Sequence, residues 1–106
     1  MTKYIYLYIG GGMPETEEDS AVVLKAWEDW FTGLGPAVVD GGYPFNPIAK
    51  SITSDGFVND GPSGSLSTGY SIVEASSMDA AVEMAKGCPH LKSGGDVSVY
   101  ETIEMN

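Results

Sequence analysis

"KYIYLYI", residues 3–9, is the clearest indication of the fold, because tyrosines and aliphatic residues alternate strictly from Tyr4 to Ile9. One set of positions holds Tyr4, Tyr6 and Tyr8, and the other holds Ile5, Leu7 and Ile9. This period of two predicts a β-strand whose two faces meet different environments. We expect the aliphatic face to lie under helices. We expect the tyrosine face, whose hydroxyls need hydrogen-bond partners, to form a subunit interface or the wall of a wet cavity.

Two other segments have the pattern of helices. Residues 16–35 begin with Thr16, a suitable N-cap, continue with three carboxylates, and end in glycines before a proline. Residues 76–87 begin with Ser76 or Ser77 as the cap, and their apolar stripe runs on to Cys88. We expect Gly87 to end this second helix.

The remaining patterns are those of strands. Residues 37–40, 69–75 and 96–105 each favour a strand, and residues 50–60 favour a hairpin that turns at Asp55-Gly56. The order is then β-α-β, a hairpin, and β-α-β again. It predicts an α+β fold: a ferredoxin-like split βαβ antiparallel sheet with an extra hairpin and two helices on one face. We expect the open face, which would carry the three tyrosines and Tyr100, to meet its copy in a homodimer.

Composition excludes several classes of partner. The 106 residues predict a single domain, 1–106, with a formal net charge of −10 and no arginine. Such a chain repels polyanions, so we expect no nucleic acid and no anionic membrane as partner. The single cysteine excludes an internal disulfide. Without a membrane-length apolar run or a signal segment, the sequence favours a cytoplasmic protein.

Longer stretches carry a family resemblance. "GYSIVEASSMDAAVEMAKGCP" (69–89), then "GGDVSVYETIEM" (94–105), together with "DGP" at 60–62, resemble the YCII-related, or DGPF-type, family over essentially the whole chain. Ser63 stands where the family signature ends in Phe. The resemblance implies a ferredoxin-like fold and a dimeric α+β barrel. It also implies acid/base chemistry on ring compounds in part of the family, but the His-Asp pair proposed for that chemistry does not transfer, since residues 21–34 contain no histidine.

Asp40 is the carboxylate that best suits a functional site. It follows the apolar run of a strand and precedes Gly41, Gly42 and Tyr43. A carboxylate in that position can have a raised pKa and act as catalytic acid or base, or it can cap its own turn on the amide of Gly41 or Gly42. The turn cap is the favoured interpretation. If a pocket exists, the ligand-binding candidates beside Asp40 are three tyrosines: Tyr6, Tyr8 and Tyr43.

Other reactive side chains favour structural roles. Cys88 and His90 are too few to bind a metal ion, and Cys88 continues a helical apolar stripe. The run of glycines at 10–12 lacks the spacing of a phosphate loop, and the serines at 63–67 lack a nucleophile elbow. Trp27 and Trp30 are spaced for a helix core. We expect neither a metal nor another cofactor.

Three functions remain open. The first is a dimeric domain that binds a small molecule, which the acidic charge and the expected tyrosine face favour. The second is an acid/base enzyme, an isomerase or lyase acting on a small ring or lactone substrate through Asp40 and a tyrosine hydroxyl. The third is an interaction module without a ligand, in which the dimer face serves assembly alone.

Overall fold

A computed structural model describes residues 1–12 and 15–105. Its elements, in chain order, are β1 (Thr2–Ile9), α1 (Glu17–Leu34), the short 3-10 turn η1 (Gly35–Ala37), β2 (Val38–Asp40), β3 (Lys50–Ile52), β4 (Val58–Asp60), β5 (Ser67–Ala75), α2 (Met78–Ala85), α3 (Pro89–Lys92) and β6 (Asp96–Glu101). Four strands form an antiparallel sheet in the order β2-β5-β1-β6, and β3 pairs with β4 apart from it. The α+β class is therefore confirmed.

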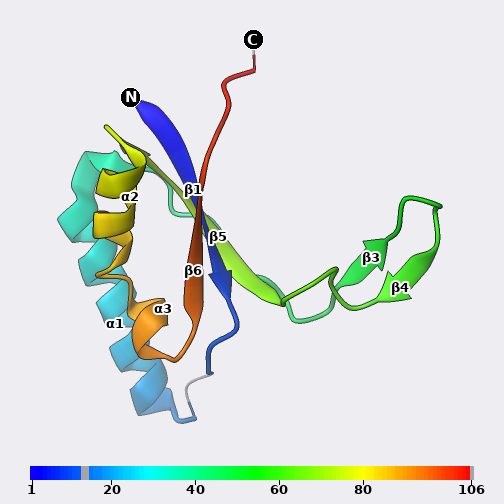
Figure 1. Cartoon of the computed structure of the whole chain (residues 1–106). Coiled ribbons are helices and arrows are strands. Elements are labelled where there is room, and N and C mark those ends of the chain that lie inside the picture. Colours follow the sequence, from blue (N-terminus) through cyan, green and yellow to red (C-terminus); the bar gives the residue numbers. More distant parts are fainter. Residues whose placement is uncertain (13–14, 106) are drawn as a thin grey trace.

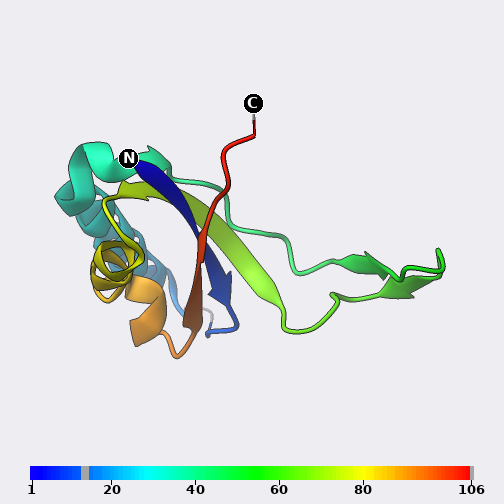
Figure 2. The same ribbon diagram turned by 45° about the horizontal axis from the view of Figure 1, so that its top comes forward.

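The helices cover one face of the sheet and leave the other open (Figures 1 and 2). Thr16 caps α1 through a 3.0 Å hydrogen bond from the Asp19 amide, and Gly35 ends the helix with φ +59°, both as predicted. Ser77 caps α2 in the same way, accepting from the Ala80 amide at 3.1 Å. Within residues 1–12 and 15–105, none of the helices combines the length and apolar character that crossing a membrane requires.

The orientation predicted for β1 is wrong. Tyr4, Tyr6 and Tyr8 lie under the helices and are at most 5 % exposed, whereas the aliphatic residues of β1 occupy the open face. Tyr100 does lie on that open face, because it pairs with Ile5. The open face thus carries the aliphatic residues of β1 together with Tyr100 of β6 and Tyr70 of β5, and it does not carry the three tyrosines of β1.

Two features make room for the rings under the helices. Directly across from the tyrosines, β5 presents small side chains: Gly69 faces Tyr8 and Ser71 faces Tyr6. The buried face of α2 is also small, with Ala81 and Ala85. Each tyrosine hydroxyl donates a hydrogen bond, to Glu101 Oε1 (3.3 Å, from Tyr4), to the Ala81 carbonyl oxygen (2.6 Å, from Tyr6) and to Ser71 Oγ (2.7 Å, from Tyr8). Burial therefore leaves no tyrosine hydroxyl of this strand without a partner.

The two tryptophans belong to the core, as predicted. Trp27 lies edge-on to Tyr8, with ring centroids 5.0 Å apart, and Trp30 lies over Tyr6 at 6.1 Å. The Trp30 indole N–H also donates to the Met84 carbonyl oxygen at 3.1 Å, which joins α1 to α2. These contacts hold both helices on one layer of aromatic rings.

The end of α2 differs from the prediction. The helix ends at Ala85 and its C-cap is Lys86 with helical dihedrals, so Gly87 does not serve as the cap. Pro89 begins the short helix α3 at its first position, where the missing proline amide costs no helical hydrogen bond.

The β3–β4 hairpin projects from the body of the molecule. Figures 1 and 2 show it extending away from the helices, past the open side of the sheet. We call residues 46–65 the arm. The radius of gyration is 15.2 Å, against roughly 13 Å for a compact domain of this length, which reflects this extension.

Candidate functional site

Asp40 and Tyr70 form a hydrogen-bonded pair on the open face of the sheet. Asp40, the last residue of β2, pairs with Ile72 of β5. Tyr70 lies two residues before Ile72 and so shares its face. The Tyr70 hydroxyl donates to Asp40 Oδ2 at 3.1 Å. The strand register thus brings together two polar groups that are 30 residues apart in the chain.

The other Asp40 oxygen caps the turn that follows. The Gly42 amide donates to Oδ1 at 2.8 Å, which is the turn cap favoured from the sequence. Gly42 has a φ of +78°, and a Cβ at this position would lie 1.7 Å from the carbonyl oxygen of Tyr70. Only glycine fits there, so the Asp40 turn lies directly against the strand that carries Tyr70.

A buried hydrogen-bond chain supports this turn from the core side. The Tyr8 hydroxyl donates to Ser71 Oγ, and the Ser71 hydroxyl donates to the Gly41 carbonyl oxygen, each at 2.7 Å. Ser71 is fully buried. Tyr8 therefore acts on the Asp40 turn through Ser71 and does not itself reach the open face.

Aromatic residues border the pair. Phe45, at the root of the arm, lies beside Tyr70 with ring centroids 6.1 Å apart, and the Phe45 amide donates to the Thr68 carbonyl oxygen at 2.8 Å. Tyr43 is 72 % exposed. The pKa of Tyr70 is raised, first by its hydrogen bond to Asp40, then by burial and by the charge of Asp40. The Tyr70 hydroxyl therefore keeps its proton at neutral pH.

This arrangement can recognise a hydrogen-bond donor. Each Asp40 oxygen accepts one bond within the protein, and a carboxylate can accept about four. The remaining lone pairs are exposed, since Asp40 is an exposed residue. The rings of Phe45 and Tyr70 offer apolar contact next to them.

The structure separates the residues predicted for the site. Asp40 and Tyr43 lie on one turn, Tyr8 reaches that turn only through Ser71, and Tyr6 lies in the core with its hydroxyl on the Ala81 carbonyl oxygen. Burial raises the pKa of Tyr6 to about 12 and that of Tyr8 well above its usual value, so both hydroxyls stay protonated. Sequence reasoning missed Tyr70, although its alternation with Ile72 in the strand at 69–75 marks it as a residue of the open face.

Cys88 and His90 have the structural roles that the sequence favoured. Cys88 is 1 % exposed, and burial raises the pKa of its thiol to about 11. The His90 imidazole donates from Nε2 to the Ile9 carbonyl oxygen at 3.0 Å, and its ring packs over Gly11 and Gly95. In residues 1–12 and 15–105, three or more His, Cys, Asp or Glu side chains nowhere gather as a metal ion would require.

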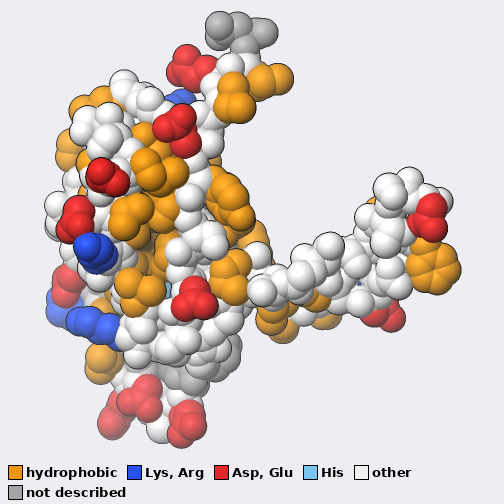
Figure 3. Space-filling view, viewed as in Figure 1, with side chains coloured by type: hydrophobic (Ala, Val, Ile, Leu, Met, Phe, Trp, Pro, Cys, Tyr) orange, Lys and Arg blue, Asp and Glu red, His pale blue; other side chains and the backbone are white. Residues whose placement is uncertain are grey.

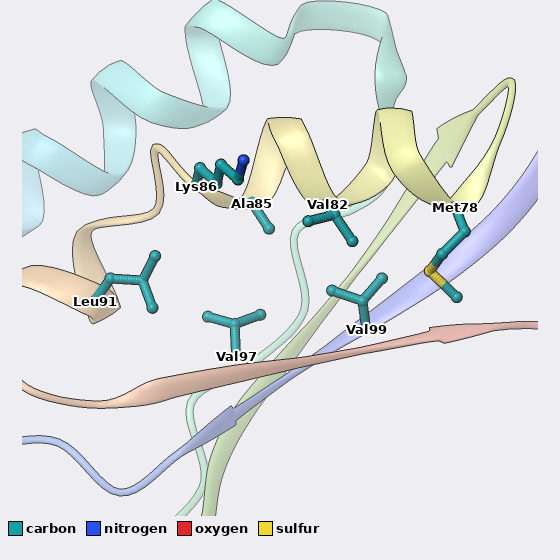
Figure 4. A pocket seen from close by; sticks show the side chains of 7 residues that line it. All are labelled: Met78, Val82, Ala85, Lys86, Leu91, Val97 and Val99. Atoms are coloured by element: carbon teal, nitrogen blue, oxygen red, sulfur yellow. The ribbon is translucent and has the colours of Figure 1, made fainter.

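A concave surface lies between α2 and the edge strand β6. It is an open groove of about 390 Å³, lined by Met78, Val82, Ala85, Lys86, Leu91, Val97 and Val99. Figure 4 shows side chains of α2 directed toward the two valines of β6, and Figure 3 shows hydrophobic side chains gathered on this part of the surface. The Lys86 ammonium binds Glu83 at 2.6 Å. The groove therefore offers apolar contact but little polar recognition.

Comparisons with known proteins assign no family. No protein-family model matches this chain, and no curated protein matches it.

Proposed function

We propose that this protein is a dimeric small-molecule-binding domain of the YCII-related type, with its ligand at Asp40 and Tyr70. The observation that carries the proposal is the Asp40–Tyr70 hydrogen bond on a sheet face that no helix covers. The strand order β2-β5-β1-β6 supports a ferredoxin-like fold, and the aliphatic open face supports a homodimer.

The ligand class follows from the groups present. Asp40 accepts hydrogen bonds, the Tyr70 oxygen can accept one more, and Phe45 offers a ring face. A net charge of −10 disfavours anionic ligands. The site therefore suits a small ring compound, neutral or cationic, that carries a hydroxyl or amine donor.

A thermal-shift screen of such compounds tests the proposal. A ligand at about one hundred times its Kd adds about 2.7 kcal/mol of stability, which raises Tm by about 10 °C or more in a domain of this size. Asp40→Asn and Tyr70→Phe should abolish the shift. The matched control, Tyr100→Phe, removes an exposed hydroxyl from the same sheet face and should keep it. A hit that is unaffected by both site variants would refute the site.

The Asp40–Tyr70 pair also favours one alternative, an acid/base enzyme of isomerase or lyase type. Asp40 would take a proton from a ring carbon, and Tyr70, which remains protonated, would donate one to a neighbouring oxygen. The two functions differ in one measurement. For any compound that binds, the enzyme predicts slow conversion that Asp40→Asn abolishes while binding persists, whereas the binding domain returns the compound unchanged.

A further inference from the structure

The arm makes all of its hydrogen bonds within itself, in the part of the chain that is described. The backbone of β3 pairs with that of β4, and the Gly61 amide donates to the Ala49 carbonyl oxygen at 2.8 Å. Lys50 binds Asp60 at 2.6 Å, and Thr53 bonds to Asp55 at the turn. An isolated two-stranded hairpin is only marginally stable in water. This hairpin therefore needs another surface to hold it in an extended position.

The arm also exposes apolar side chains that its own body does not cover. Ile48 is 82 % exposed, Ile52 71 %, Phe57 65 % and Val58 53 %. Ile52 and Val58 are a cross-strand pair, with Phe57 next to them at the turn. Scattered apolar residues are ordinary on a protein surface, but four on one short hairpin mark a contact surface.

The arm and the open sheet face border the same hollow. The arm extends past the open side of the sheet, and the hollow between it and the body is visible in Figure 3. The sheet contributes Ile5, Leu7 and Ile72 to this side. A single occupant can therefore cover both apolar surfaces.

Charge favours a second copy as that occupant. Seven of the fifteen carboxylates of this acidic chain lie on the helices that cover the other face, five on α1 and Asp79 and Glu83 on α2. The centre of the open face, with Ile5, Leu7 and Ile72, is uncharged. Its carboxylates lie at the border: Asp40 on the edge strand β2, Glu74 opposite Lys3, and Asp96 at the start of β6. Depletion of charge at the centre is typical of an interface, and here it lets two chains of net charge −10 meet without a carboxylate at the centre of the contact.

We propose that the arm of each copy clasps the other copy in a closed two-fold dimer. This inference rests on the homodimer of the proposed function and adds the arm to it. In a two-fold pair the open sheet faces meet, and each arm extends along the flank of its partner. The arm root contains Phe45, which contacts Tyr70, so clasping also fixes one border of the candidate site.

The first test is the dimer dissociation constant of the full chain, measured by analytical ultracentrifugation. We expect wild type to be a dimer and the double variant Ile52→Ser/Phe57→Ser to dissociate at least tenfold more readily. The control Val22→Ser/Leu24→Ser removes apolar side chains of similar exposure, 69 % and 61 %, from α1 and should leave the constant unchanged. Near-ultraviolet dichroism from Trp27 and Trp30 verifies that each variant is folded.

The second test identifies the surface that the arm contacts. Phe57 is replaced by the photo-crosslinking residue p-benzoylphenylalanine, and chains labelled with heavy nitrogen are mixed with unlabelled chains. We expect cross-links between a heavy and a light chain. The same residue placed at Val22 serves as the control and should give none.

The outcomes separate the two proposals. A monomeric wild type overturns the dimer and the clasp together. The clasp is overturned, and the dimer stands, if the arm variant leaves the dimer dissociation constant unchanged. The same holds if the cross-links from position 57 stay within one chain. An assembly larger than a dimer also overturns the clasp, because a closed two-fold pair adds no third copy.

Discussion

At the residue scale, Gly42 is the most constrained position near the candidate site. Its φ of +78° strains any L side chain, and a Cβ there would overlap the Tyr70 carbonyl oxygen. Backbone strain alone costs about 1–3 kcal/mol, and we expect Gly42→Ala to lower the free energy of unfolding by at least that amount. The control is Gly33→Ala in α1, where a Cβ has open space and the change should stabilise by about 0.5–1 kcal/mol. Chemical denaturation measures the free energy of unfolding of both variants. Equal effects of Gly42→Ala and Gly33→Ala would contradict the requirement for glycine at position 42.

The chain from Tyr8 through Ser71 to Gly41 gives a second prediction at this scale. Ser71→Ala leaves the buried Tyr8 hydroxyl without its acceptor and should cost about 1–3 kcal/mol. Tyr8→Phe removes only the donor and should cost about 0.5–1.5 kcal/mol. Because the two residues share one hydrogen bond, the double variant should cost less than the sum. Additive effects in a double-mutant cycle would show that the bond contributes nothing.

The buried thiol of Cys88 predicts a loss of stability in alkali. In the folded protein the pKa of Cys88 rises from 9.0 to about 11, chiefly through burial. Between these values the unfolded chain has lost the thiol proton and the folded chain has kept it. Ionisation of the thiol therefore does not affect the free energy of unfolding below pH 9.0. It lowers that free energy as pH rises from 9.0 to about 11, by at most about 1.4 kcal/mol per pH unit.

Tyr6 contributes a similar loss at higher pH, because burial raises its pKa from 10.0 to about 12. Denaturation measured from pH 7 upward should therefore show a flatter slope near pH 10 in Cys88→Ala than in wild type. The slope is the relevant quantity, because the substitution also leaves a small cavity that lowers stability at every pH. Identical slopes would contradict a raised thiol pKa.

At the element scale, α2 fits the sheet through small residues. Ala81 is fully buried and its carbonyl oxygen accepts from the Tyr6 hydroxyl, whereas the next residue, Val82, borders the open groove. We expect Ala81→Leu to destabilise by about 1–3 kcal/mol through overpacking. Val82→Leu, which enlarges the neighbouring side chain toward free space, should be neutral within about 0.5 kcal/mol. Thermal melts measure both variants. If Ala81→Leu and Val82→Leu lowered Tm equally, the close packing of Ala81 against the sheet would be contradicted.

The two long helices and the strands were predictable, but the short helix α3 and the buried face of β1 were not. Alternation located the strand at residues 3–9, and capping residues located both helices. Which face a strand buries depends on the residues across from it. Here the small β5 residues Gly69 and Ser71 admit the tyrosine rings, and that register is a long-range property that alternation does not contain. The pairing of Asp40 with Tyr70 was beyond prediction for the same reason.

At the scale of the whole molecule, the proposed dimer must overcome electrostatic repulsion. Each chain carries a formal charge of −10, and the carboxylates of α1 and α2 lie on the side away from the apolar sheet face. Raising ionic strength from about 0.01 M to about 0.1 M shortens the Debye length from about 30 Å to about 10 Å. Screening therefore weakens the repulsion between copies but leaves apolar contact intact.

We accordingly expect the dimer dissociation constant to fall as salt is added across this range. An interface held by ion pairs would behave in the opposite way, since salt screens attraction as well as repulsion. Sedimentation at a series of salt concentrations distinguishes an apolar interface from one held by ion pairs. A constant that rises with salt would show that charged residues, not the apolar open sheet face and the arm, join the copies.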